Sequence, residues 1–257
     1  MRVAVFSDIH GNISGLRAVL AAIARQGSVD TLVSAGDQLG GGPGAADVLD
    51  LLVERDVRLL RGNADEWCLD LDAAWRQQLR ALQSVRAVTD VDAAHKEWLG
   101  KVRPIHDWLR RQLSHAHRDL LASLPLSATF EAAPGHRLLV CHANPATPWA
   151  REQGARTPAH ALRQAYGQVD AQIIAYGHVH RHHVLPFEGK LLVWTWTYHP
   201  TQIPSFRDDK ESRPRTGVRS SRTIAVARSV ATCQQRDSTK SCHAPLTVSV
   251  QTSVSSC

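Results

Sequence analysis

Short, mostly apolar runs recur along the first three-quarters of the chain, and a polar cluster follows directly behind five of them. These five runs are residues 3–6, 32–35, 57–60, 138–141 and 173–176. Runs of this length predict buried strands of an α/β sheet. Between the first three runs, apolar residues recur at helical spacing over 16–23 and again over 48–52. The alternation of strand and helix predicts a parallel sheet with right-handed crossovers.

The pattern changes between about residues 66 and 124, where strand signals are absent. There the apolar positions Ile105, Trp108, Leu109 and Leu113 have helical spacing. We expect an inserted helical cap there, covering the end of the sheet where the polar clusters gather. An ordinary set of packing helices is the alternative. After this segment a helix is predicted around 158–166. Further strands are expected near 126–131, 137–141, 172–176 and 190–196.

The end of the chain, from about Trp194, differs in composition from everything before it. Of residues 201–257, 18 are Ser or Thr, Leu occurs once, and no strand or helix period persists for long. One interpretation is a disordered basic extension. The other, which we favour, is a shift of reading frame near Val193 that has replaced the native C-terminal strands, and sequencing the gene across that codon distinguishes the two. We therefore expect a domain over 1–193 and an atypical tail over 194–257.

The charge distribution follows the same division. The whole chain has a formal net charge of +6 and a pI near 9.4. The tail contains nine Lys and Arg against four Asp and Glu, which leaves 21 against 20 in the rest of the chain. Because the body is almost neutral, nucleic acid is not an expected partner.

Cysteine spacing and hydropathy narrow the class of protein further. The five cysteines form no CxxC pair, so neither a zinc knuckle nor a disulfide framework is indicated. No apolar stretch approaches the roughly 20 residues of a membrane helix. The apolar part of the N-terminal segment is too short for a signal peptide. We therefore expect a cytoplasmic protein with no membrane partner.

The polar clusters contain side chains that bind divalent cations. Seven candidate ligands follow the predicted strands: Asp8, His10, Asp37, Asn63, His142, His178 and His180. Ligands of open α/β sheets gather beyond the carboxyl ends of the strands, so these residues are expected to converge. Asp8 and His10 flank one residue, which would point both side chains to the same side of an extended strand end. Asp37 could place one carboxylate between two ions.

The chemistry of these ligands indicates which metals they would hold. Mixed imidazole, carboxylate and amide groups suit Mn²⁺, Fe, Zn²⁺ or Ni²⁺ better than Ca²⁺ or Mg²⁺. We expect two divalent ions, with Mn²⁺ as the first choice. Each cluster alone has a structural alternative, such as a turn at Gly36-Asp37 or a hydrogen-bonded core histidine at His142. The occurrence of all five in order, each at a strand end, favours the metal interpretation.

These motifs, taken together, resemble the calcineurin-like metallophosphoesterase family, and most closely its small bacterial branch of phosphodiesterases and diadenosine-tetraphosphatase-like proteins. The resemblance covers about residues 1–193 and implies a four-layer αββα sandwich with a dinuclear centre at one edge. It rests on Asp8-Ile9-His10-Gly11-Asn12, Gly36-Asp37, Gly62-Asn63-Ala64-Asp65, His142 and Gly177-His178-Val179-His180. It further implies that Asp37 bridges two metals. One would be held by Asp8, His10, Asp37 and His180, and the other completed by Asn63, His142 and His178.

Two cations about 3.5–4 Å apart would hold a bridging water and lower its pKa towards about 7. The resulting hydroxide would attack phosphorus in line, so we assign no protein nucleophile. Cys141 lies inside a predicted strand and is expected to be a small core residue. Asn12 and Asn63 are the expected substrate contacts.

Position 64 departs from the pattern of the family. Many members have Gly-Asn-His-Asp, in which the histidine is thought to protonate the departing alkoxide, whereas this chain has Ala64. Loss of a general acid typically costs about 10²–10⁴ in rate. Esters with acidic leaving groups would suffer least. Asp65, without that histidine beside it, is expected to be the N-cap of the next helix rather than a catalytic residue.

The sequence therefore predicts a metal-dependent phosphoric ester hydrolase that acts on phosphodiesters or nucleotide-type substrates. The alternatives are a dinucleoside-polyphosphate hydrolase, a phosphomonoesterase of the protein-phosphatase kind, and a non-catalytic interaction module of the same fold. The last is disfavoured because such modules usually lose ligands, whereas this chain retains all seven.

Overall fold

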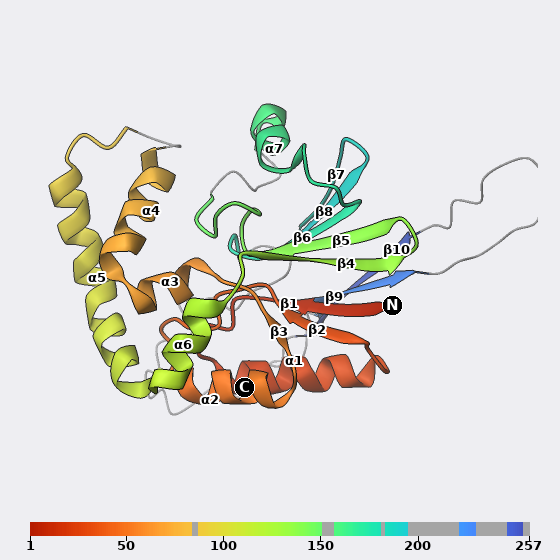
Figure 1. Ribbon diagram of the computed structural model, residues 1–257, viewed down its shortest axis with the longest axis horizontal. Helices are drawn as coiled ribbons and strands as arrows, with labels where there is room; N and C mark the ends of the chain where they lie inside the picture. The colour runs from red at the N-terminus through yellow and green to blue at the C-terminus, as the bar shows by residue number, and fades with distance from the viewer. Residues whose placement is uncertain (84–86, 151–156, 181–182, 195–220, 230–245, 254–257) are drawn as a thin grey trace, which may run out of the picture.

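The computed structural model describes residues 1–83, 87–150, 157–180, 183–194, 221–229 and 246–253. Its strands form two five-stranded sheets, which lie face to face in Figure 1. The strands are β1 (Arg2–Phe6), β2 (Thr31–Ser34), β3 (Arg58–Leu59), β4 (Ser127–Ala133), β5 (His136–Cys141), β6 (Ile173–Tyr176), β7 (His183–Phe187), β8 (Lys190–Trp194), β9 (Ser221–Ser229) and β10 (Leu246–Ser253). The first sheet has the order β10-β9-β1-β2-β3, and the second has the order β4-β5-β6-β8-β7.

The central strands of both sheets are parallel, as predicted. β1, β2 and β3 pair in parallel, and so do β5, β6 and β8. Nearer the edges, β4, β7 and β9 pair antiparallel with their neighbours. β7, which the sequence analysis missed, joins β8 through Glu188 and Gly189, both with positive φ. A two-residue turn of this kind permits only antiparallel pairing.

Helices cover the outer faces of the two sheets. In Figure 1, α1 and α2 lie against the first sheet and α7 lies against the second. The helices are α1 (Ile13–Arg25), α2 (Ala45–Glu54), α3 (Asn63–Leu69), α4 (Leu71–Gln83), α5 (Val91–Gln112), α6 (His115–Ser123) and α7 (Ala159–Tyr166). The order helix, sheet, sheet, helix confirms the predicted four-layer α/β sandwich.

The alternation of side chains along each central strand builds these layers. Val3 and Val5 of β1 belong to the core between the sheets, whereas Ala4 and Phe6 belong to the core beneath the helices. β5 and β6 alternate in the same way between the inter-sheet core and the core beneath α7. Strands with apolar residues on both faces are buried on both faces, which explains why their sequences read as continuous apolar runs.

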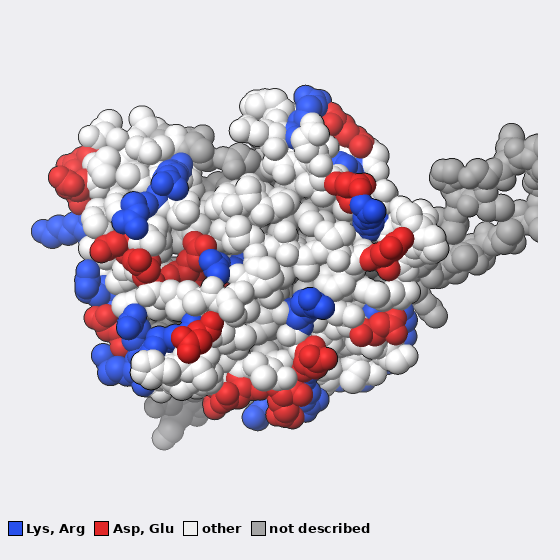
Figure 2. All heavy atoms as spheres, in the orientation of Figure 1, with Lys and Arg blue, Asp and Glu red and all other residues white. Residues whose placement is uncertain are grey.

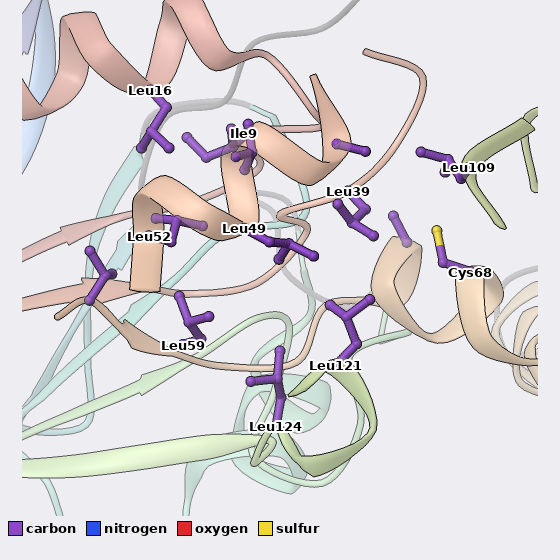
Figure 3. Close-up of a cluster of buried hydrophobic side chains, with 14 of the residues drawn as sticks. Ile9, Leu16, Leu39, Leu49, Leu52, Leu59, Cys68, Leu109, Leu121 and Leu124 are labelled. Atoms are coloured by element: carbon purple, nitrogen blue, oxygen red, sulfur yellow. The ribbon is translucent and has the colours of Figure 1, made fainter. Parts of the chain in front are cut away.

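The four helices between β3 and β4 pack into the core under α1 and α2. Figure 3 shows Leu16 and Leu52, from α1 and α2, in one buried cluster with Cys68, Leu109 and Leu121 from the inserted helices. The inserted segment therefore extends the helical layer of the first sheet. Its contribution to the cavity described below comes from α3.

The tail contributes two strands that the sequence analysis did not predict. β9 pairs antiparallel with β1, with Val5 opposite Ala225, and β10 pairs with β9. The alternation of apolar residues in 246–250 was an available signal. Most other tail residues lie outside the described part of the chain, and the proposed shift of reading frame stays a prediction.

Charged side chains are mixed on the surface of the sandwich. On the face shown in Figure 2, basic and acidic side chains are interspersed rather than gathered by sign. This mixture agrees with the near balance of charge in the body of the chain. Among the described helices, none has the length and apolar character needed to span a bilayer.

Two adjacent residues of α2 test the assignment of its buried face. Leu52 is 0% exposed and Val53 is 57% exposed. Leu52→Ala should lower the free energy of unfolding by about 2–5 kcal/mol, because it removes packed atoms and leaves a cavity. Val53→Ala should change it by less than about 0.5 kcal/mol. Urea denaturation followed by circular dichroism measures both, and equal losses would contradict this packing.

Candidate metal centre

The seven predicted ligands lie at one edge of the sandwich. β1, β2 and β3 carry Asp8, His10, Asp37 and Asn63 on the segments that follow them, and β5 and β6 carry the other three histidines. Parallel strands within each sheet end at the same edge, and the inter-sheet core brings the two edges together. The structure thus brings all seven side chains together from positions up to 172 residues apart, His180 lying against Asp8.

Asp8, His10 and His180 form the first of two groups. Their ligand atoms lie within 4.8 Å of one another. His180 Nε2 is 3.1 Å from Asp8 Oδ1, and His10 Nε2 is 3.8 Å from the same oxygen and 3.3 Å from His180 Nε2. Asp37 joins this group through Oδ2, which is 3.8 Å from His10 Nε2.

The second group surrounds Asn63. Its Oδ1 is 3.0 Å from His142 Nε2 and 2.8 Å from His178 Nδ1. Asp37 Oδ1 is 3.5 Å from His142 Nε2. The candidate ligand atoms of Asp8, Asp37 and His142 also lie within 4.8 Å of one another. One oxygen of Asp37 therefore faces each group.

The backbone at these ligands is unusual. Asp8, His10, Asp37, His178 and His180 all have left-handed φ values, between 50° and 68°. Such conformations cost on the order of 1–3 kcal/mol for non-glycine residues and cluster at functional sites. They also correct the expectation of an extended strand end, because β1 stops at Phe6 and a turn brings Asp8 and His10 together.

Three glycines allow the ligand segments to approach closely. Gly36, Gly62 and Gly177 each precede a ligand directly. A Cβ at Gly62 would lie 2.1 Å from Asp37 Oδ1, and one at Gly177 would lie 2.4 Å from Asp8 Oδ2. At Gly36 a Cβ would lie 2.6 Å from a ring nitrogen of His142. The sequence analysis quoted these glycines without assigning them this role, although their position before each ligand was a readable signal.

The tautomers of two histidines follow from their backbone partners. His10 Nδ1 lies 3.1 Å from the carbonyl of Leu39, and His142 Nδ1 lies 3.0 Å from that of Ala35. A carbonyl only accepts, so each Nδ1 donates and each neutral ring presents a bare Nε2. His142 Nε2 then faces two further acceptors, the oxygens of Asn63 and Asp37. Acceptors that converge in this way fit a divalent cation between them.

Burial and neighbouring charges shift the pKa values of several candidate ligands. Asp8, Asp37 and His142 are at most 2% exposed. Burial raises the pKa of Asp37 to about 7, against the opposing effect of His10. Burial also opposes ionisation of Asp8, but the hydrogen bond from His180 and the charges of His142 and His10 hold its pKa well below the usual range. Burial lowers the pKa of His142, which keeps its ring neutral and able to bind a metal.

A cavity of about 250 Å³ opens onto this centre. Besides five of the ligands it is lined by Gly40 and Gly41 from the segment after β2 and by Ala64 and Trp67 from α3. Among these described lining residues there is no Lys or Arg, so histidines are the only lining side chains there that could balance the carboxylates. This deficit of positive charge also fits bound divalent ions.

Two other predicted residues lie outside the cavity lining. Asn12 is the N-cap of α1, and its Oδ1 accepts from the amide of Gly15 at 2.8 Å. Its side chain is therefore used for capping, and the expected contact of Asn12 with substrate stays a prediction. Asp65 is not itself an N-cap, because it is the third residue of α3. Its carboxylate completes the cap by accepting from the amide of Gly62 at 2.9 Å.

Comparison with known proteins places this geometry in a family. The calcineurin-like phosphoesterase superfamily domain matches residues 1–195. A search of curated proteins finds no match. A metallophosphoesterase from Sphaerobacter thermophilus is similar in structure, with a TM-score of 0.54 and 22% identity over 88% of this chain and 82% of that one.

A hypothetical protein, PH1004, from Pyrococcus horikoshii OT3 has the same coverage of both chains, a TM-score of 0.55 and 17% identity. At these identities the two structures bear on the fold alone, and they agree with the sandwich described above. The match over residues 1–195 shows that the chain belongs to the calcineurin-like phosphoesterase superfamily.

Proposed function

We propose that this protein is a metal-dependent phosphoesterase that hydrolyses phosphodiester or nucleotide-type substrates at a centre of two divalent cations. The observation that carries the proposal is the position of Asp37, which presents one carboxylate oxygen to each of two groups of ligands. The family uses divalent metals, and the described residues contain two groups able to hold them.

Asp8, His10 and His180 would hold the first cation together with Asp37 Oδ2. The second would be held by Asp37 Oδ1 with Asn63, His142 and His178. Mixed nitrogen and oxygen donors make Mn²⁺ the first candidate, with Fe, Zn²⁺ and Ni²⁺ as alternatives. When bound, the two cations would polarise the phosphoryl oxygens and acidify a water molecule for in-line attack.

The residues of the chain prepare the centre for this chemistry. The backbone carbonyls of Leu39 and Ala35 fix the rings of His10 and His142 with Nε2 directed inward. The amide of Ala64 donates to Asp37 Oδ1 at 2.7 Å and so orients the shared carboxylate. Ligands held in place before binding need little reorganisation during the reaction, which is the main source of electrostatic catalysis.

Position 64 bears on the choice of substrate. Ala64 lines the cavity next to Asn63 and offers a methyl group where an imidazole could protonate a leaving group. A leaving group that departs there must therefore be stable as an anion or take its proton from water. Aryl phosphomonoesters, aryl phosphodiesters and phosphoanhydrides meet that condition better than alkyl phosphomonoesters.

Metal dependence is the first test. The purified protein with Mn²⁺ should hydrolyse bis(p-nitrophenyl) phosphate. Chelation or Asp37→Ala should lower the rate on the order of 10³-fold or more, because metal ions contribute several kcal/mol and about 1.4 kcal/mol is worth a factor of ten. Asp119→Ala, at an exposed position of α6, serves as the control and should keep full activity. Full activity after chelation would defeat the proposal.

The second test restores a proton donor at position 64. Ala64→His should raise the rate on phosphoserine, whose leaving group is an alkoxide, relative to p-nitrophenyl phosphate, by up to about 10²-fold if the imidazole acts as a general acid. Ala64→Asn adds comparable bulk without a group that titrates near neutrality, and it should leave the ratio of the two rates unchanged. A parent protein that turns over phosphoserine faster than p-nitrophenyl phosphate would overturn the substrate argument.

A further inference from the structure

The carboxylate of Asp65 is buried beside the metal centre without lining its cavity. Asp65 is 0% exposed. Its two oxygens accept three backbone N–H groups: Oδ2 accepts from Gly62 at 2.9 Å and from Asp37 at 3.1 Å, and Oδ1 accepts from Leu39 at 3.1 Å. Only the bond from Gly62 belongs to the cap of α3. The other two come from a segment 26 and 28 residues earlier in the chain.

The two segments are also bonded in the opposite direction. The amide of Ala64, next to Asp65, donates to Asp37 Oδ1 at 2.7 Å, while the amide of Asp37 donates to Asp65. Asp37 has a left-handed backbone, with φ of 52°. A non-glycine residue keeps that conformation only where its surroundings over-determine it. The hydrogen bonds of the Asp37 amide to Asp65 and of its carboxylate to Ala64 supply that constraint.

Three candidate ligands depend on these bonds. Asp37 is held directly, through its amide. Asn63 follows Gly62, whose amide is bound by the same oxygen of Asp65. His10 is oriented by the carbonyl of Leu39, the residue whose amide donates to Asp65 Oδ1. A single carboxylate thus restrains ligands from the segments after β1, β2 and β3.

We propose that Asp65 is a positioning residue for the metal centre, and that its carboxylate sets the placement of Asp37, Asn63 and His10 for cation binding. This inference rests on the proposed function in one respect, namely that those residues bind cations. Asp65 itself touches neither cation nor substrate. Partners that orient metal ligands in this way typically contribute about 10–100-fold to metal affinity.

The number of donors explains why a carboxylate is needed. Three N–H groups point at two acceptor oxygens. An asparagine of the same size has one acceptor oxygen, and its NH₂ group would face a backbone N–H. Asp65→Asn therefore keeps the packing and loses at least one of the three bonds.

The experiment compares Asp65→Asn with the parent protein and with Ser114→Ala. Ser114 caps α6 in the same helical insertion by accepting from the amide of His117 at 3.1 Å, but it makes no contact with the centre among the described interactions. Mn²⁺ binding to metal-free protein is measured by isothermal titration calorimetry, and thermal unfolding by circular dichroism. Asp65→Asn should weaken Mn²⁺ binding about 10–100-fold. Its hydrolysis of the diester should recover at saturating Mn²⁺. Ser114→Ala should lower only the melting temperature.

Each outcome distinguishes the two proposals. Unchanged Mn²⁺ affinity in Asp65→Asn, with a lower melting temperature as in Ser114→Ala, would reduce Asp65 to a helix cap and overturn the inference alone. Weakened Mn²⁺ binding in a protein that hydrolyses no phosphate ester would support the inference and overturn the proposed function. A parent protein that binds no Mn²⁺ would overturn both. If Asp65→Asn does not fold, the smaller Asp65→Ser is measured in the same assays and judged by the same outcomes.

Discussion

The structure depends on holding many hydrogen-bond acceptors close together at one edge of its two sheets. Carboxylates, an amide oxygen and bare imidazole nitrogens face one another within hydrogen-bond range, and the described cavity lining offers no Lys or Arg to separate them. Such a set is repulsive without a cation. Glycines, left-handed turns and buried backbone bonds hold it together, so the local conformational cost is offset by the fold around it.

The sandwich supplies the rigidity that this arrangement needs. One sheet carries the ligands that follow β1, β2 and β3, and the other carries those that follow β5 and β6. The apolar core between the sheets, with Val3, Val5, Leu138 and Val140 among its members, sets the distance between the two halves of the centre. The packing of this core therefore helps to place Asp37 relative to the ligands on the second sheet.

Much of the fold and of the candidate centre could be predicted from the sequence. The short apolar runs predict the strands, and the polar clusters behind them predict the ligands at the strand ends. The left-handed turns at Asp8 and His10 could not be predicted from the spacing of these residues. An extended strand would also place the two side chains on one side, so the spacing does not distinguish the two conformations. The bonds of Asp65 join segments separated by 26 residues or more, which no local pattern encodes. The strand β7 was hidden by Pro186, which strand patterns disfavour but an edge strand tolerates.

The pairing of β9 with β1 has a consequence for the edge of the first sheet. β1 lies between β2 and β9, so both of its backbone edges are hydrogen-bonded. A chain shortened after β8 would leave one side of β1 as an open row of amides and carbonyls, immediately ahead of Asp8. Open rows of this kind invite pairing with a second molecule. β9, with β10 beside it, therefore closes the backbone edge of the strand that leads to Asp8.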